Sequence, residues 1–271
     1  MISIFWALKI FVLDEADEMV SEDSSQKSRT KTIVMALPRT CQLLLFSATF
    51  PEEVYKFAKM VISKQNVRHG GRCNEIKLKS NEECVLDEIK QFKMKVSGVG
   101  KMETLIDIYS VLETAMSIIF VEEKKTADML EQKMLAEGYT VSKLHGNLRP
   151  EERDAVMEAF RQVKTKVLIT TNVLARGMDI AGVNLVVNYD PPFKTVYPDP
   201  KKFPDAENYI HRIGRCGRFG RKGIAISFVA DQTDLQLYSE IEEMYNFKLT
   251  DAPEDVEELA EMISEMMASS E

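Results

Sequence analysis

Carboxylates near the start of the chain and arginines near its end are the residues best suited to chemistry. Asp14, Glu15 and Asp17 directly follow the apolar run of residues 10–13, and Arg215 and Arg218 come about two hundred residues later. Carboxylates can hold a cation and orient water, whereas the rigid fork of a guanidinium group matches phosphate oxygens. Together they predict a site for the phosphate chain of a nucleotide, with acids and arginines on opposite sides.

Three further polar clusters each follow the carboxyl end of a predicted strand. They are Ser47-Ala48-Thr49 after residues 42–46, His145-Gly146 after residues 141–144, and Thr170-Thr171-Asn172 at the end of residues 167–171. Functional groups gather beyond the carboxyl ends of the strands in a parallel sheet, so the full set predicts an active cleft. Taken alone, the acids could instead cap the N-terminus of a helix.

Short β-branched strands alternate with amphipathic helices along most of the chain. The predicted strands are residues 9–13, 42–46, 117–121, 141–144, 167–171, 185–189 and 224–229. The predicted helices are residues 32–37, a segment starting at Pro51, and residues 102–112, 124–137, 151–160 and 206–213. This alternation predicts an α/β fold in which helices cover both faces of a parallel sheet.

Four segments are expected along the chain. Residues 1–66 contain too few strands to close a sheet, so further strands are expected upstream. Residues 67–80 are polar, contain two glycines and predict a linker. Residues 81–250 predict a complete domain, and residues 251–271 an amphipathic helix with Pro253 and Glu254 in its first turn. This helix is expected to pack on the domain, with binding of a partner protein as the alternative.

The composition, with 45% hydrophobic and 29% charged residues, is that of a globular protein. The net charge of −8 means that any site for a polyanion must be a local patch. The four cysteines show no Cys-x-x-Cys spacing, which favours reduced thiols in an intracellular protein over a zinc site. Residues 1–8 lack the features of a signal peptide and are too few to span a bilayer.

One glycine-containing segment only superficially resembles a phosphate-binding loop. In residues 98–102, Met102 stands in place of the needed hydroxyl, and no strand is predicted just before the segment. It therefore predicts a loop that enters a helix. No Gly-x-x-x-x-Gly-Lys-[Ser/Thr] motif occurs in the chain. His69 and His145 lack metal-ligand spacing and are not assigned as ligands.

The ordered set of motifs resembles the DEAD-box RNA helicases over nearly the whole chain. The motifs are Asp14-Glu15-Ala16-Asp17, Ser47-Ala48-Thr49, Ile118-Ile119-Phe120, Leu144-His145-Gly146, Thr170-Thr171-Asn172 with residues 175–179, and residues 211–218. The resemblance implies RecA-like domains, of which residues 1–66 are the end of the first and residues 81–250 the complete second. Residues 38–42, Asn172 and the insert at residues 193–208 resemble the nuclear-pore-associated mRNA-export branch.

The resemblance implies an ATP-dependent RNA helicase that uses ATP and Mg²⁺. It implies that Asp14 holds Mg²⁺ through water, that Glu15 positions the attacking water, and that Arg215 and Arg218 contact the γ-phosphate. Coupling of nucleotide state to domain closure is implied for Asp17, Ser47, Thr49 and His211. The resemblance implies that Asp179 and Gly177 contact ATP. It implies that Gly146, Arg153 and Thr171, and also Gly177, contact the RNA backbone. Arg176 is expected to brace its own loop.

The same resemblance implies single-stranded or duplex RNA and protein activators as partners of a monomer that binds no membrane. It implies an intracellular location, in the cytoplasm and nucleus and at the nuclear pore. Pro150 stands where many members have Gln, and Cys216 where Thr is usual, and both changes are expected to tune activity rather than abolish it.

The family's adenine-reading segment and phosphate loop precede the position of Asp14. The 271 residues alone are therefore expected to hydrolyse ATP at a background rate. Two alternatives stay open: a non-catalytic module that binds RNA or a partner protein, and a DNA translocase of the same fold, against which the Asp-Glu-Ala-Asp and Ser-Ala-Thr motifs argue.

Overall fold

The computed structural model of the chain forms two compact units, Met1–Leu78 and Lys79–Glu271. It describes residues 7–20, 27–47, 49–50, 52–65, 74–76, 89–98, 100–112, 116–172, 180, 182–195, 201–217, 222–253 and 255–268. The division between the units falls within the segment for which a linker is predicted, residues 67–80.

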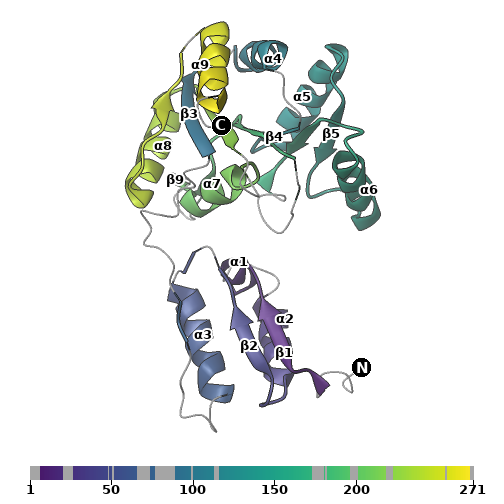
Figure 1. The fold of residues 1–271 in the computed structure, drawn as a ribbon, viewed down its shortest axis with the longest axis vertical. Coiled ribbons are helices and arrows are strands. Elements are labelled where there is room, and N and C mark those ends of the chain that lie inside the picture. The colour runs from purple at the N-terminus through teal and green to yellow at the C-terminus, as the bar shows by residue number, and fades with distance from the viewer. Residues whose placement is uncertain are drawn as a thin grey trace. The chain divides into compact units, whose positions relative to one another are not determined.

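The first unit is built on two parallel strands, β1 (Ile10–Leu13) and β2 (Gln42–Leu45), with Ile10 opposite Gln42 (Figure 1). Its helices are α1 (Ala16–Val20), α2 (Lys27–Ala36) and α3 (Glu52–Gln65). On α3, Val54, Phe57 and Val61 recur at helical spacing and are buried in one small core. On β1, alternation leaves Ile10 and Val12 about half exposed, whereas Leu13 is buried in this core.

In the second unit, seven described strands form one parallel sheet in the order β11-β3-β10-β7-β4-β6-β5. The strands are β3 (Ile89–Lys95), β4 (Ser117–Phe120), β5 (Val141–Leu144), β6 (Val167–Thr170), β7 (Leu185–Asn188), β10 (Gly223–Val229) and β11 (Thr250–Asp251). The helices are α4 (Lys101–Val111), α5 (Lys124–Ala136), α6 (Pro150–Arg161), α7 (Ala206–Ile213), α8 (Gln232–Tyr245) and α9 (Val256–Ala268). The predicted α/β fold with a parallel sheet is confirmed.

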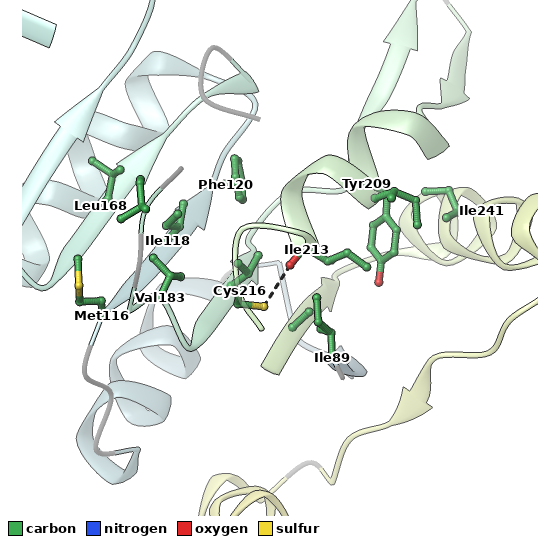
Figure 2. Close-up of a cluster of buried hydrophobic side chains, with 14 of the residues drawn as sticks. Ile89, Met116, Ile118, Phe120, Leu168, Val183, Tyr209, Ile213, Cys216 and Ile241 are labelled. Carbon is green, nitrogen blue, oxygen red and sulfur yellow. Dashed lines mark hydrogen bonds between the residues drawn. The ribbon is translucent and has the colours of Figure 1, made fainter. Parts of the chain in front are cut away.

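Both faces of this sheet are covered by helices. Along β4, Ile118 and Phe120 belong to one core, whereas Ile119 packs into the other, because successive side chains of a strand point to opposite faces. Helices α6, α7 and α8 close the first core, part of which is drawn in Figure 2, and α4, α5 and α9 close the second. Strands buried on both faces explain the nearly continuous apolar runs in the sequence.

The insert between β7 and α7 contains a short antiparallel hairpin, β8 (Phe193–Thr195) with β9 (Lys202–Pro204). Among the described residues, no helix is long and apolar enough to cross a membrane.

Several elements differ from the predictions. Strand β3 and helix α8 lie in segments for which no element is predicted, since lysines and glutamates interrupt their apolar patterns. Residues 98–102 do enter a helix, but the expectation that no strand closely precedes them is wrong, because β3 ends at Lys95. The last helix begins at Val256, so Pro253 does not lie in its first turn, and β11 occupies the start of the predicted helical segment.

Candidate functional site

Two acids predicted to act at the phosphates lie at the carboxyl end of β1. The exposed carboxylate of Asp14 accepts a hydrogen bond from the amide of Glu15 at 2.9 Å. Glu15 has a φ of 49°, a left-handed conformation that is uncommon for residues other than glycine, and it turns the chain from β1 into α1. The amide of Phe46 donates to the carbonyl of Leu13 at 2.8 Å, and the amide of Ala16 to that of Phe46 at 3.0 Å. These bonds hold the turn against the end of β2.

The third acid, Asp17, joins the two hydroxyl residues after β2. Its amide donates to Oγ of Ser47 at 3.1 Å, and Oγ1 of Thr49 donates to its Oδ2 at 2.8 Å. Asp17 is buried, with 3% of its surface exposed. The side chain that bonds this amide in the first turn of α1 is Ser47, so helix capping does not account for Asp14. The structure thus brings together three residues for which a coupling role is predicted, and that role stays a prediction.

In the second unit, Arg153 on α6 holds the loop that follows β5. Its Nε donates to the carbonyl of Leu148 at 3.1 Å, and its Nη2 to the carbonyl of Gly146 at 2.9 Å. Within the same loop, Nδ1 of His145 accepts from the amide of Asn147 at 3.3 Å. Two donors of this guanidinium therefore set the path of the backbone at Gly146. Contact of Gly146 and Arg153 with RNA stays a prediction.

Thr171 lies next to this loop, directly after β6. It is buried, with 8% exposed, and its amide donates to the carbonyl of Leu144 at 3.4 Å. Its own carbonyl accepts a hydrogen bond from Oγ1 of Thr170 at 2.8 Å. The predicted site residues Gly177, Asp179 and Arg218, and also Arg176, lie outside the described residues.

Helix α7 carries two predicted site residues, His211 and Arg215, within and just after its last turn. The carboxylate of Asp205 caps its first turn by accepting from the amide of Asn208 at 3.2 Å. His211 and Arg215 are both buried, with 6% exposed. Nε of Arg215 donates to the carbonyl of His211 at 3.0 Å. One edge of the predicted phosphate-contacting guanidinium is therefore bonded to the preceding helical turn.

An ionic cluster around a buried arginine, on the same edge of the sheet, was missed by sequence reasoning. Its centre is Arg212, which is fully buried on α7 and lies over the ring of Phe120, 5.1 Å from the ring centre. Its Nη2 donates to Oε1 of Glu122 at 2.5 Å and also bonds Oδ1 of Asn172. Its Nη1 donates to the carbonyl of Asp190 at 2.8 Å. A fully buried charge of this kind requires such partners.

The bonds of Arg212 reach the carboxyl ends of three strands that are neighbours in the sheet. Glu122 follows β4, Asn172 follows β6 and Asp190 follows β7. The carboxylate of Asp190 in turn accepts from the amide of Glu122 at 3.0 Å and pairs with Lys101 of α4 at 2.9 Å. One arginine and one lysine thus neutralise two carboxylates among these residues. Burial raises the pKa of Glu122 above its ordinary value, even though Arg212 and Asn172 oppose that shift.

One signal in the sequence could have found this cluster. Asn172 is one of the features that resemble the mRNA-export branch, and Arg212 lies inside the motif of residues 211–218, in which roles are predicted for His211, Arg215 and Arg218. Neither observation names a partner, because Glu122 is 50 residues from Asn172 and 90 from Arg212 in the sequence.

Comparison with known proteins matches both units. The protein family described as "DEAD/DEAH box helicase" matches residues 3–57, and the family described as "Helicase conserved C-terminal domain" matches residues 100–220. The "ATP-dependent RNA helicase DBP5" of Mycosarcoma maydis is 45% identical over 265 residues, which are 96% of this chain and 54% of that protein. The chain therefore spans about half the length of the curated relatives that it matches.

Two solved structures are also similar. One is S. cerevisiae Dbp5 bound to RNA and ADP BeF3, with 40% identity and a TM-score of 0.84, covering 97% of this chain and 64% of that one. The other is the C-terminal domain of the DEAD-box protein Dbp5, with 44% identity and a TM-score of 0.60, covering 66% of this chain and 98% of that one.

Proposed function

This chain belongs to the DEAD-box helicase family, and from that premise we propose that it is part of an ATP-dependent RNA helicase that separates RNA strands or remodels RNA–protein complexes. The observation that carries the proposal is the placement of the charged and hydroxyl residues. In the first unit, Asp14 and Asp17 follow the carboxyl end of β1. In the second unit, Thr171 follows β6, and Arg212 of α7 bonds residues that follow the carboxyl ends of neighbouring strands. Such strand ends are where parallel sheets bind ligands.

The first unit supports binding of a Mg²⁺–ATP complex from its acidic side. Mg²⁺ is held in such sites by one or two carboxylates together with the phosphates of the substrate, and the exposed carboxylate of Asp14 fits that role. When bound, Mg²⁺ supplies positive charge to the phosphates. Glu15 would orient the attacking water.

The second unit would supply the positive charge of a protein side chain. Arg215 and Arg218 would contact the γ-phosphate, where such an arginine typically accelerates transfer by about 10³–10⁵-fold, or roughly 4–7 kcal/mol of barrier. Asp179 and Gly177 would contact ATP. Asp17, Ser47 and Thr49, with His211, would couple the state of the nucleotide to closure of the two units.

RNA would bind through phosphate and sugar contacts at Gly146, Arg153 and Thr171, with little dependence on base sequence. We further propose protein activators, a role in mRNA export and an association with the nuclear pore. These rest on the similarity to the Dbp5 helicases rather than on any contact within the described residues.

A hybrid enzyme tests the proposal, because no phosphate loop occurs in these 271 residues. In it, the N-terminal half of the Mycosarcoma maydis relative precedes this chain, and phosphate release is measured with and without single-stranded RNA. We expect RNA to stimulate hydrolysis and Glu15→Gln to lower the rate by about 10²–10⁴-fold. Binding of RNA by an inactive hybrid would favour a non-catalytic module, and stronger stimulation by duplex DNA than by RNA would favour a DNA translocase.

A further inference from the structure

The exposed amide of Asn172 bridges the ion pair of the buried Arg212 with the partly exposed Glu122, and acts as acceptor and donor at once. Its Oδ1 accepts from Nε of Arg212 at 3.2 Å and also bonds Nη2 of the same guanidinium. Its Nδ2 lies 3.3 and 3.4 Å from the two carboxylate oxygens of Glu122 and donates to them. Arg212 also pairs directly with Glu122 at 2.5 Å. The three side chains therefore close a triangle of hydrogen bonds.

The triangle needs a neutral amide at one corner. A carboxylate can only accept hydrogen bonds when it is ionised, whereas an asparagine amide also donates two. With an aspartate at position 172, two carboxylates would face each other at about the distance that now separates the amide from Glu122, and like charges at such distances repel. A lysine at position 212 could not replace the planar fork, because its single ammonium cannot reach the ends of three strands.

The triangle links the two parts of the second unit that carry predicted ligand contacts. Asn172 directly follows Thr171, which is predicted to contact RNA. Arg212 lies between His211 and Arg215 on the segment predicted to face ATP. Arg212 is fully buried and cannot replace a lost partner with water, although its bonds to Asn188 and Asp190 remain. A change in the triangle is therefore expected to disturb the end of β6, or α7, or both.

We propose that Asn172, Glu122 and Arg212 form a positioning cluster that fixes the RNA-contacting end of β6 relative to α7, and that the amide of Asn172 is required for it. The link to RNA rests on the proposed function, whereas the link between β6 and α7 does not. The three side chains are positioning residues, since they act through Thr171 and Arg215 rather than on a ligand.

Exchange of two side chains tests the cluster. Asn172→Asp removes the donor, and Glu122→Gln removes the charge that faces Arg212. The double variant Glu122→Gln/Asn172→Asp exchanges the amide and the carboxylate, so that one donor and one charge are again present. The control Asn246→Asp makes the same charge change in the same unit at the end of α8, where Asn246 is exposed, as Asn172 is.

The first measurement is amide hydrogen exchange of the 271-residue chain without ligand. We expect Asn172→Asp to accelerate exchange of α7 and of residues 170–172 by about tenfold or more, and the double variant to restore most of the protection. Unchanged protection of α7 in Asn172→Asp would overturn the proposal. So would a folded double variant that is no better protected than the single one, and this comparison also decides the matter if Asn172→Asp alone does not fold.

The second measurement is the affinity for a fluorescent single-stranded RNA, read by anisotropy. Asn172→Asp should weaken binding by about two- to thirty-fold, and the exchanged pair should recover most of it. The groups around Glu122 are Arg212 of α7 and Asp190 after β7, which is paired with Lys101 of α4. Because protonation of one carboxyl supplies the missing donor, the defect of Asn172→Asp should become smaller as the pH is lowered.

The two measurements separate the two proposals. If the unchanged chain binds no RNA but amide hydrogen exchange of the variants follows the prediction, RNA binding by this unit is refuted while the cluster stands. If the chain binds RNA and the double variant recovers neither affinity nor protection, the cluster is refuted while the RNA helicase proposal stands.

Discussion

Oγ1 of Thr49 donates a hydrogen bond to Oδ2 of Asp17 at 2.8 Å, although 32 residues separate the two in the sequence. The bond joins the segment after β2 to the first turn of α1. It gives one carboxylate oxygen of the buried Asp17 a hydroxyl partner in place of water. The bond is the contact through which the proposed coupling of Ser47 and Thr49 to Asp17, three residues from Asp14, would act.

Loss of this hydroxyl should loosen the first unit. Thr49→Val keeps the shape of the side chain but leaves the buried carboxylate of Asp17 without that donor, at an expected cost of about 1–3 kcal/mol. Thr49→Ser keeps the hydroxyl and should restore most of the stability. Hydrogen exchange of the α1 amides measures the effect. The exposed Thr40→Val is the matched control in the same unit, and an equal effect there would contradict the prediction.

Cys216 should be inert to alkylation in the folded protein. It is fully buried in the core drawn in Figure 2, where its Sγ donates to the carbonyl of Ile213 at 3.1 Å, and burial raises its pKa to about 12. At pH 8 only about one thiol in ten thousand would then be ionised. Treatment with iodoacetamide followed by peptide mass mapping should label Cys216 only after unfolding in guanidinium chloride. Labelling of the native protein would contradict this account.

Glu242 should make the second unit sensitive to acid. Burial alone would raise its pKa, but hydrogen bonds from the Leu249 amide, Lys248 and Lys93 hold the pKa below the ordinary 4.5. Because the folded state then binds the proton less tightly than the unfolded state, this stability is present above about pH 4.5 and is lost as pH falls through the lowered pKa.

The variant Glu242→Gln measures this contribution. It should lower the free energy of unfolding by about 1–3 kcal/mol at pH 7, and the gap from the unchanged protein should shrink below about pH 4. Urea denaturation at pH 7 and below about pH 4 gives the free energies of unfolding. Glu243→Gln, at an exposed neighbouring position, should leave both unchanged, whereas a gap that stays constant with pH would rule out the charge of Glu242 as the cause.

A side chain at Gly223 should destabilise the protein, because β10 begins there against the turn that follows α7. A Cβ on Gly223 would lie 2.6 Å from the amide nitrogen of Gly217 and 2.7 Å from Sγ of Cys216. Gly223→Ala should therefore destabilise the protein by about 1–3 kcal/mol, and removing the sulfur in Gly223→Ala/Cys216→Ala should recover only part, since the backbone clash remains. Thermal melts test this. Gly98→Ala, whose Cβ would meet open space, should melt like the unchanged protein.

Apolar periodicity and turn residues in the sequence predicted most of the helices and strands of the second unit. The strand Val141–Leu144 and the helix Ala206–Ile213 have the bounds predicted for them, because each is a periodic apolar segment with a clear turn or capping residue beside it. Strand β3 and helix α8 were not predicted. Their charged side chains, such as Lys93 and Glu242, look solvent-facing in sequence, but in the fold they neutralise each other.

The sequence by itself determined the α/β class, the family and the list of candidate residues, since motif order and apolar periodicity are properties of the chain. Only the tertiary structure decided which of these residues meet. It joined Asp17 to Ser47 and Thr49, turned Arg153 toward the carbonyl of Gly146, and buried Arg212 between Glu122 and Asn172. The physical reason is that a buried charge is tolerated only with partners, and those partners come from strand ends that are neighbours in the sheet but far apart in the chain.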